Sequence, residues 1–301
     1  MAHPLIVQNA GNTCYIDSLL ISIFFEKSFD KLLITDPKIT NAIYLQEFIK
    51  IQFVDCIRQD KSVLEDTINT MRQLLYENGW KKDETEIFSQ QDVTEFYTFL
   101  VDIFNGPLIE TRRTTISEGL PDIGDNGIIE KLPFIPLSLP DNFTEVKIRD
   151  LLDSWLNDNV SSLKRKIYKN GNRPNDTVED NVNALNIYNI ENVPYMVGLS
   201  INRFKDIYKR DQTDIIIQRK INPSNSVSYP FQHSWVFHAA ICHIGDSPKN
   251  GHYYCIVEKE KVFYLFDDLQ IPSVVKIDMS EPAITSQIKK NVVFILYRLE
   301  N

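Results

Sequence analysis

The strongest constraint on the fold of this chain is that its helical and strand patterns occupy different parts of the sequence. Through the first third, apolar residues recur at the spacing of an α-helix. The last third contains short runs of β-branched and aromatic residues, which are typical of β-strands. A block of helices followed by a block of strands indicates an α+β fold in which the strands form an antiparallel sheet.

The expected helices lie mainly in the first third of the chain. One apolar face covers Tyr15–Phe24, and Ser89-Gln-Gln-Asp92 is a variant of the capping box, which predicts a helix that begins near Ser89. On that helix the acids Asp92, Glu95 and Asp102 lie opposite the apolar face, as a solvated stripe would. The remaining expected helices are residues 48–55, 64–75 and 147–156.

Strand patterns begin in the middle third and dominate the last. Because the sequence contains no internal repeat, low-complexity tract or linker, we expect a single domain over residues 1–301. The expected strands are residues 109–116, 134–139, 162–168, 195–203, 215–220, 235–243, 252–257, 262–267 and 292–298.

The charge and the cysteines of the chain exclude several classes of partner and compartment. A formal net charge of −9 disfavours nucleic acid and anionic membranes, and it favours a basic partner. The N-terminus lacks the basic and apolar regions of a signal peptide, and no apolar run is long enough to span a membrane. The four cysteines form no Cys-x-x-Cys pair. We therefore expect free thiols and a reducing compartment, either the cytoplasm or the nucleus.

A cysteine stands where a Gly-Asn turn gives way to an apolar helix, in Asn9-Ala-Gly-Asn-Thr-Cys14. Two interpretations are open. Free cysteine is among the most buried residue types, so Cys14 could be a small hydrophobic residue near a helix start. Alternatively, the unpaired N–H groups and the dipole of the helix favour a thiolate at this position, which would make Cys14 a nucleophile.

A cysteine nucleophile needs a base, usually histidine, and the pattern around His252 suits that role. The run that starts at His252 and the run that ends at Asp267 flank a polar turn, which predicts a hairpin. If Val257 pairs with Val262, His252 lies directly opposite Asp267, where a carboxylate could orient the imidazole. The alternative is a histidine at a strand end that has no chemical task.

The sequence gives little support for a metal site. His252 and Cys255 are near each other, but an offset of three residues in a strand puts them on opposite faces. His238 and Cys242 share one strand with apolar neighbours, which indicates core or surface positions. We therefore expect neither a metal ion nor a cofactor.

Five segments, in the right order over nearly the whole chain, resemble the signature sequences of the ubiquitin-specific proteases. Each alone would be weak, but their order is specific. They are the cysteine box Asn9–Leu20, the segment Gln90-Gln-Asp-Val-Thr-Glu-Phe96, the strand Tyr195–Phe204, the histidine box of His243-Ile-Gly, Gly251-His-Tyr and Phe266-Asp-Asp, and the last strand Val293–Arg298.

The resemblance implies a papain-like cysteine protease fold, in which a thumb, a palm and fingers grip ubiquitin. The thumb would be approximately residues 1–105, the fingers with part of the palm 106–190, and the palm 191–301. Many members bind zinc at the fingertips through two Cys-x-x-Cys pairs, and this chain has none. We therefore expect a minimal catalytic core whose fingers are held by packing and strand pairing alone.

The resemblance also implies roles for particular residues. Cys14 would be the nucleophile, His252 the base and Asp267 the residue that orients it. Asn9 would donate to the oxyanion with a backbone N–H at the helix start. Asp268 matches the second acid of the family's pair and would have a supporting role.

Further residues in the matching segments would bind the C-terminal tail of ubiquitin. Asp92 and Glu95 match the acids that bind the arginines of the tail, and Tyr253 matches the aromatic residue that flanks the Gly-Gly channel. The other candidates for substrate binding are Gln91, Phe204 and His243.

The chain departs from the family's cysteine box at two positions. Asp17 and Ile21 stand where the family usually has asparagine and glutamine. Because an acid near the nucleophile tends to raise the pKa of the thiol, we expect modest turnover.

Taken together, the sequence predicts a monomeric, thiol-dependent deubiquitinase that acts on ubiquitin and ubiquitinated proteins. It would hydrolyse the isopeptide or peptide bond after the C-terminal Gly-Gly of ubiquitin. Two alternatives remain: a protease for another ubiquitin-like modifier, and a ubiquitin-binding module that is catalytically silent.

Overall fold

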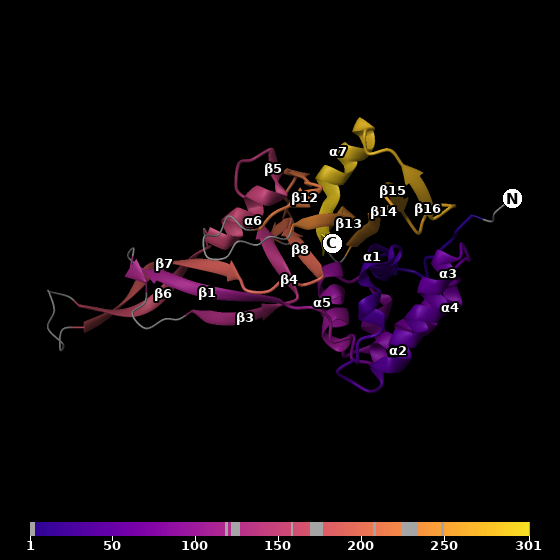
Figure 1. Cartoon of the computed structure of the whole chain (residues 1–301), viewed down its shortest axis with the longest axis horizontal. Helices are drawn as coiled ribbons and strands as arrows, with labels where there is room; N and C mark the ends of the chain where they lie inside the picture. Colours follow the sequence, from indigo (N-terminus) through magenta and orange to yellow (C-terminus); the bar gives the residue numbers. More distant parts are fainter. Residues whose placement is uncertain are drawn as a thin grey trace.

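The computed structural model describes residues 4–117, 120–121, 127–157, 159–168, 177–206, 209–223, 234–247 and 250–300. Helices fill the first third of the chain and strands predominate afterwards, which confirms the predicted α+β fold (Figure 1). Within these residues, no helix has both the length and the apolar character that crossing a membrane requires.

The helical third of the chain gathers at one end of the molecule (Figure 1). The helices predicted at residues 15–24, 48–55 and 64–75 all form, the second of them as a continuous run of short segments. In chain order, including 3₁₀ and π segments, the helices are α1 (Cys14–Phe24), η1 (Lys27–Leu33), α2 (Ala42–Phe48), η2 (Ile49–Val54), α3 (Asp55–Arg58), α4 (Glu65–Glu77), η3 (Glu84–Phe88) and α5 (Val93–Ile103).

The main sheet has eight strands, in the order β16-β15-β14-β13-β17-β8-β4, with β12 paired to β13. All its pairs are antiparallel, as expected, except that β4 pairs with β8 in parallel. The strands are β4 (Phe134–Ser138), β8 (Met196–Asn202), β12 (Lys220–Ile221), β13 (Trp235–Ser247), β14 (Asn250–Lys259), β15 (Val262–Phe266), β16 (Val274–Ile277) and β17 (Val292–Leu299).

A second sheet of five strands projects away from the helices and the main sheet (Figure 1). Its order is β2-β1-β7-β6, with β3 paired to β1. The strands are β1 (Ile109–Ser117), β2 (Leu120–Pro121), β3 (Ile128–Leu132), β6 (Asn159–Tyr168) and β7 (Thr177–Ile190). The other elements are α6 (Ile148–Asn157), α7 (Pro282–Asn291), the pair β5 (Glu145–Lys147) and β11 (Asp214–Ile216), and the pair β9 (Phe204–Asp206) and β10 (Lys209–Arg210).

Helix α1 is buried along its entire length, although its sequence predicts one apolar face. It packs against η1 and α5 and also against strands β13 and β14, so the helical part and the main sheet enclose it together. Three polar side chains, Asp17, Ser18 and Ser22, are buried with it. The start of α1 is therefore held firmly between the two parts of the fold.

Helix α5 begins at Val93 and not at Ser89, which corrects the predicted capping box. Ser89 is extended, and the N-cap is Asp92, whose Oδ1 accepts the backbone N–H groups of Thr94 at 2.7 Å and Glu95 at 3.1 Å. A carboxylate that satisfies two of the free N–H groups of the first turn fixes the start of a helix.

The predicted hairpin forms between β14 and β15, but its register differs by two residues from the expected one. Val257 pairs with Tyr264 and not with Val262. The turn consists of Glu260 and Lys261, which both have positive φ, at 52° and 65°. Positive φ at both central residues is typical of the tight turns that match the twist of a hairpin.

Candidate active site

The chain reverses direction directly in front of Cys14, the first residue of α1. Gly11 and Asn12 have φ of 75° and 58°, which glycine and asparagine adopt more readily than other residues. The Asn9 side chain closes the turn, because its Oδ1 accepts the backbone N–H of Gly11 at 2.8 Å. The Gly-Asn pair noted in the sequence therefore places Cys14 at the N-terminus of a buried helix.

The thiol of Cys14 lies beneath strand β14. Backbone N–H groups of Tyr253 and Tyr15 lie within hydrogen-bonding range of its sulfur. Burial raises the pKa of the thiol to about 12, and the carboxyls of Asp268 and Asp17 act in the same direction. Cys14 is therefore protonated at neutral pH, and a base has to remove its proton before it can attack.

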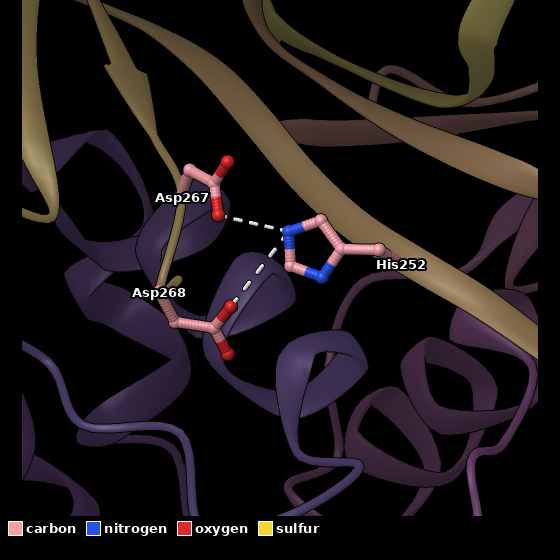
Figure 2. Close-up of side chains that lie close together, drawn as sticks. All are labelled: His252, Asp267 and Asp268. Carbon is pink, nitrogen blue, oxygen red and sulfur yellow. Dashed lines mark hydrogen bonds and ion pairs between the residues drawn. The ribbon is translucent and has the colours of Figure 1, made fainter. Parts of the chain in front are cut away.

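His252, the candidate base, points from β14 toward two acids that follow β15. Its Nε2 lies 2.8 Å from Oδ1 of Asp267 and 3.9 Å from Oδ1 of Asp268 (Figure 2). A register slip of two residues keeps every side chain on its face of the sheet, so His252 meets Asp267 diagonally and not directly across. With the Nε2 hydrogen directed at Asp267, Nδ1 is the basic nitrogen of the neutral ring.

The two acids also set the charge of the ring. Burial disfavours the imidazolium form of His252, but the hydrogen bond to Asp267 and the charges of both acids outweigh it and raise the pKa of His252 above 6.5. Burial likewise opposes ionisation of Asp267, yet His252 and the backbone N–H of Leu269 hold the pKa of Asp267 below its usual value. Asp267 is therefore a carboxylate that favours a protonated His252.

Asn9 reaches the second acid from the other side. Its amide Nδ2 donates to Oδ2 of Asp268 at 2.7 Å, and the Asp268 side chain is fully buried. The sequence predicted a role for a backbone N–H of Asn9, whereas in the structure it is the side chain of Asn9 that forms hydrogen bonds, to Asp268 and to Gly11. An amide has two donor hydrogens, of which Asp268 takes one.

Among the residues that the structure describes, His252, Asp267 and Asp268 form a group that could hold a metal ion. One ligand atom from each lies within 4.8 Å of the others; the sequence grouped these residues as catalytic candidates and not as metal ligands. Asp267 is already bound to the ring of His252 and Asp268 to the amide of Asn9. The absence of a metal and of a cofactor stays a prediction.

The sequence of the chain matches a protein family described as ubiquitin carboxyl-terminal hydrolase over residues 7–297. The chain belongs to this family. Ubiquitin carboxyl-terminal hydrolase 15 of Schizosaccharomyces pombe is 24% identical over 288 residues, which cover 87% of this chain and 24% of that protein. Ubiquitin carboxyl-terminal hydrolase 15 of Saccharomyces cerevisiae is 23% identical over 300 residues, covering 89% of this chain and 23% of that protein. The chain thus spans about a quarter of the length of these relatives.

Solved structures of the family have the same fold. The SAGA Ubp8/Sgf11/Sus1/Sgf73 DUB module bound to ubiquitin aldehyde contains a chain that is 16% identical, with a TM-score of 0.68. The match covers 99% of this chain and 70% of that chain. In the same module bound to monoubiquitin, the TM-score is 0.69 and the match covers 99% and 69% of the two chains. At this level of identity the likeness establishes the fold.

A cavity of about 250 Å³ lies between the start of α5, the end of β8 and Tyr253 of β14. Three of the residues predicted to bind substrate line it: Asp92, Phe204 and Tyr253. Tyr253 also directs its backbone N–H at the sulfur of Cys14. Tyr253 therefore links the cavity to the candidate nucleophile, although Cys14 is not among the residues that line it.

His243 lies behind this cavity and not in its lining. Its ring packs on those of Tyr253 and Phe204, with centroids 4.5 and 6.0 Å apart. Gln90, which the sequence did not single out, places its Nε2 3.2 Å from Nε2 of His243, and its Oε1 accepts the backbone N–H of Gly251 at 3.1 Å. Burial, together with nearby positive charge, lowers the pKa of His243 to about 4, so the ring is neutral and supports the cavity wall.

Two predicted substrate-binding residues lie outside the lining of the cavity. Gln91 is buried and donates to the backbone oxygen of Glu86 at 2.7 Å. Glu95 is exposed on the first turn of α5 and pairs with Lys81 at 2.8 Å. The structure therefore separates Gln91 from the other candidates and leaves Glu95 at the surface near Asp92.

Arg72 is a positioning candidate that no pattern in the sequence indicated. It projects from α4, is nearly fully buried, and donates to the backbone oxygens of Ala10 and Gly11. The guanidinium also lies over the ring of Phe88, 5.0 Å from its centroid. From the sequence, an arginine on an amphipathic helix is expected at the surface. Only the folded chain shows that Arg72 stabilises the turn before Cys14 through hydrogen bonds to its backbone.

Proposed function

We propose that this chain is a thiol-dependent deubiquitinase that hydrolyses the isopeptide or peptide bond after the C-terminal Gly-Gly of ubiquitin. The observation that carries the proposal is the 2.8 Å contact of His252 with Asp267, on the strand that covers a buried cysteine at a helix start. Family membership and the fold shared with ubiquitin-bound relatives support the choice of substrate. We assign the helical part to the thumb, the projecting sheet to the fingers and the main sheet to the palm.

In the proposed reaction His252 is the general base. Its Nδ1 takes the proton of Cys14 as the sulfur attacks the carbonyl carbon of the terminal glycine, and a C–S bond forms. The imidazolium, stabilised by Asp267, then gives that proton to the leaving amine as the C–N bond breaks. Water, activated by the same ring, hydrolyses the thioester and releases ubiquitin.

The oxyanion of this reaction needs donors near Cys14. The start of α1 provides unpaired backbone N–H groups, and the second hydrogen of the Asn9 amide is the proposed side-chain donor. Asp268 holds this amide through its 2.7 Å contact. Because a donor in a fixed position needs no reorganisation during the reaction, Asp268 has a supporting role.

The tail of ubiquitin is proposed to enter the cavity lined by Asp92, Phe204 and Tyr253. The aromatic walls suit a Gly-Gly segment, which has no side chains, and the acids suit the arginines that precede it. Glu95 lies on the first turn of α5, close to its N-cap Asp92, and would be reached by the same tail.

Asp92→Asn combined with Glu95→Gln should raise KM for ubiquitin substrates more than tenfold, with a smaller change in kcat. Charge-assisted pairs of this kind contribute about 1.5–3 kcal/mol each when they are partly desolvated. Asparagine is chosen because Asp92 caps α5, and asparagine caps helices as well as aspartate does. Steady-state kinetics on a ubiquitin C-terminal amide would measure both parameters.

The matched control is Asp102→Asn, which removes an exposed acid from the far end of the same helix. It should leave KM within about twofold of the wild type, because exposed pairs contribute little. If the double variant binds ubiquitin as tightly as the wild type does, the two acids are only a solvated face.

Asp267→Asn should move the acid limb of the kcat/KM profile to lower pH by about one unit. The amide oxygen can still accept the Nε2 hydrogen of His252, but the negative charge that stabilises the imidazolium is gone, so the pKa of His252 falls. Since a Cys-His-Asn arrangement also supports papain-like catalysis, the plateau rate should stay within about tenfold of the wild type. An acid limb that does not move would show that Asp267 does not set the charge of His252.

Hydrolysis of a ubiquitin C-terminal amide and of isopeptide-linked diubiquitin tests the proposal itself. We expect both to be cleaved by the purified chain without added metal. Binding of ubiquitin without any cleavage would instead support a catalytically silent module, and cleavage of only another modifier's conjugates would support the second alternative.

A further inference from the structure

Asp17 is a buried acid that the proposed reaction does not use. It lies in the first turn of α1, three residues after Cys14, and its side chain is fully buried. In the part of the chain that the structure describes, neither of its carboxyl oxygens meets a hydrogen-bond donor. An ionised carboxylate without a donor is very costly to bury, so this position favours the neutral acid.

A second orphaned oxygen lies beside it. Asp268 is also fully buried; its Oδ2 accepts from Asn9, whereas its Oδ1 has no donor among the described residues. The side chains of Asp17 and Asp268 lie within hydrogen-bonding range of each other. Two buried carboxyls in contact cannot both be ionised, and a proton on one of them provides a hydrogen-bond donor for the other.

The surroundings decide which acid carries the proton. Asp268 faces the positive charge of His252 and accepts from Asn9, and both stabilise a carboxylate. Asp17 has no equivalent partner: the hydroxyl of Thr13 is close but not in hydrogen-bonding geometry. The guanidinium of Arg72 acts on it only through charge: its Nη1 donates to Asn69, its Nη2 donates to the backbone oxygens of Ala10 and Gly11, and its buried Nε meets no acceptor among the described residues, Asp17 included.

We propose that Asp17 is a carboxylic acid in the folded protein at neutral pH and that its hydroxyl donates to Oδ1 of Asp268. Asp17 is then a positioning residue: it fixes Asp268, and Asp268 in turn holds the amide of Asn9 and adds negative charge beside His252. The assignment of the proton is independent of the reaction, whereas the positioning role rests on the proposed function.

The titratable groups that face Asp17 come from three parts of the fold. Cys14 and Tyr15 belong to its own helix, Asp268 follows β15, and Arg72 belongs to α4. Burial and the charge of Asp268 outweigh the opposing charge of Arg72, so the pKa of Asp17 lies well above its ordinary value of 3.8. Ionisation of Asp17 in alkaline solution would place a second negative charge beside Asp268 and disfavour the thiolate of Cys14.

The proton can be counted from the pH dependence of unfolding, without any substrate. Above the ordinary pKa of an aspartate, the unfolded chain has Asp17 ionised while the folded chain keeps it protonated. Folding therefore takes up a proton, and stability falls as pH rises toward the folded pKa. Asp17→Asn removes this proton, so the ratio of the wild-type to the variant unfolding equilibrium constant should rise about tenfold per pH unit in that range.

Activity tests the positioning role with a matched pair of variants. Asp17→Asn keeps a donor toward Asp268 and should retain kcat at neutral pH to within about threefold, while sustaining it to higher pH than the wild type. Asp17→Leu keeps the branched shape in a larger side chain but has no donor, and should lower kcat about 10- to 100-fold with little change in KM. Rescue by asparagine and not by leucine distinguishes a donor from a simple core residue.

Infrared spectroscopy of the wild type provides a readout that does not depend on the variants folding. A buried carboxylic acid gives a carbonyl band above the amide region at neutral pH, and Asp17→Asn should abolish it.

The absence of such a band, or the same pH dependence of unfolding in the wild type and Asp17→Asn, would overturn the proton assignment. An asparagine variant as impaired as the leucine variant would overturn the positioning role. Failure of the wild type to cleave ubiquitin conjugates would refute the proposed function alone, since the proton count and the infrared band need no substrate.

Discussion

Cys14→Ala is expected to abolish hydrolysis of ubiquitin substrates while ubiquitin still binds. In the proposed mechanism, attack on the carbonyl needs the sulfur of Cys14, whereas ubiquitin is recognised by the cavity that Asp92, Phe204 and Tyr253 line. Alanine is also the smallest change at a buried position, so the start of α1 should stay in place. Initial rates on a ubiquitin C-terminal amide, with binding measured by calorimetry, separate the two effects.

Cys56→Ala is the matched control, because Cys56 is a partly exposed thiol on α3, outside the site. This variant should turn over substrate at the wild-type rate. Residual turnover by Cys14→Ala within tenfold of the wild type would rule out Cys14 as the nucleophile.

Asn9→Ala is expected to lower kcat by about 10²–10³, the usual effect of removing one oxyanion donor, with little change in KM. The variant loses the amide that donates to Asp268 and the oxygen that accepts from Gly11. The thermal midpoint of unfolding must therefore be measured together with the kinetics. A loss confined to KM, or one that tracks a loss of stability, would make Asn9 a structural residue of the turn.

The central contact of the site could be predicted from the sequence even though the exact pairing could not. His252 and Asp267 end two runs that alternate around a polar turn, and any register that differs by an even number of residues keeps them on the same face. The turn at Glu260 and Lys261 depends on two positive φ angles, which neither residue type favours. The predicted pairing of Val257 with Val262 was therefore wrong by two residues, but it still placed His252 next to Asp267.

Polar or mixed sequence explains the elements that were missed. Strand β7 runs through an Asn-rich stretch that lacks a continuous apolar face. It is held as a strand by its backbone pairing with β1 and β6, which the sequence pattern does not indicate. Helix α7 has a proline at its first position and lysines in its last turn, but only Ile288 of its residues is buried. The strand expected at residues 215–220 divides between β11 and β12, which pair with different partners.

The roles of the residues that position the site could not be predicted from the sequence, for a different reason. Gln90 and Arg72 act through backbone groups that are far away in the sequence, those of Gly251 and of the turn before Cys14. Gln90 opens one of the segments that match the family, but its contact and that of Arg72 follow from packing, which the sequence alone does not show. Asp17 was noticed only as an unusual acid near the nucleophile, and its relation to Asp268 required the folded chain.

The most direct test of the proposed function is covalent capture by ubiquitin that carries an electrophile at its C-terminus. We expect one ubiquitin to be added per chain, mapped to Cys14 by mass spectrometry of the digested adduct, and faster than any probe built on another ubiquitin-like modifier. Cys14→Ala should give no adduct. Capture at a different cysteine, no capture at all, or faster reaction with another modifier's probe would contradict a ubiquitin-specific hydrolase that acts through Cys14.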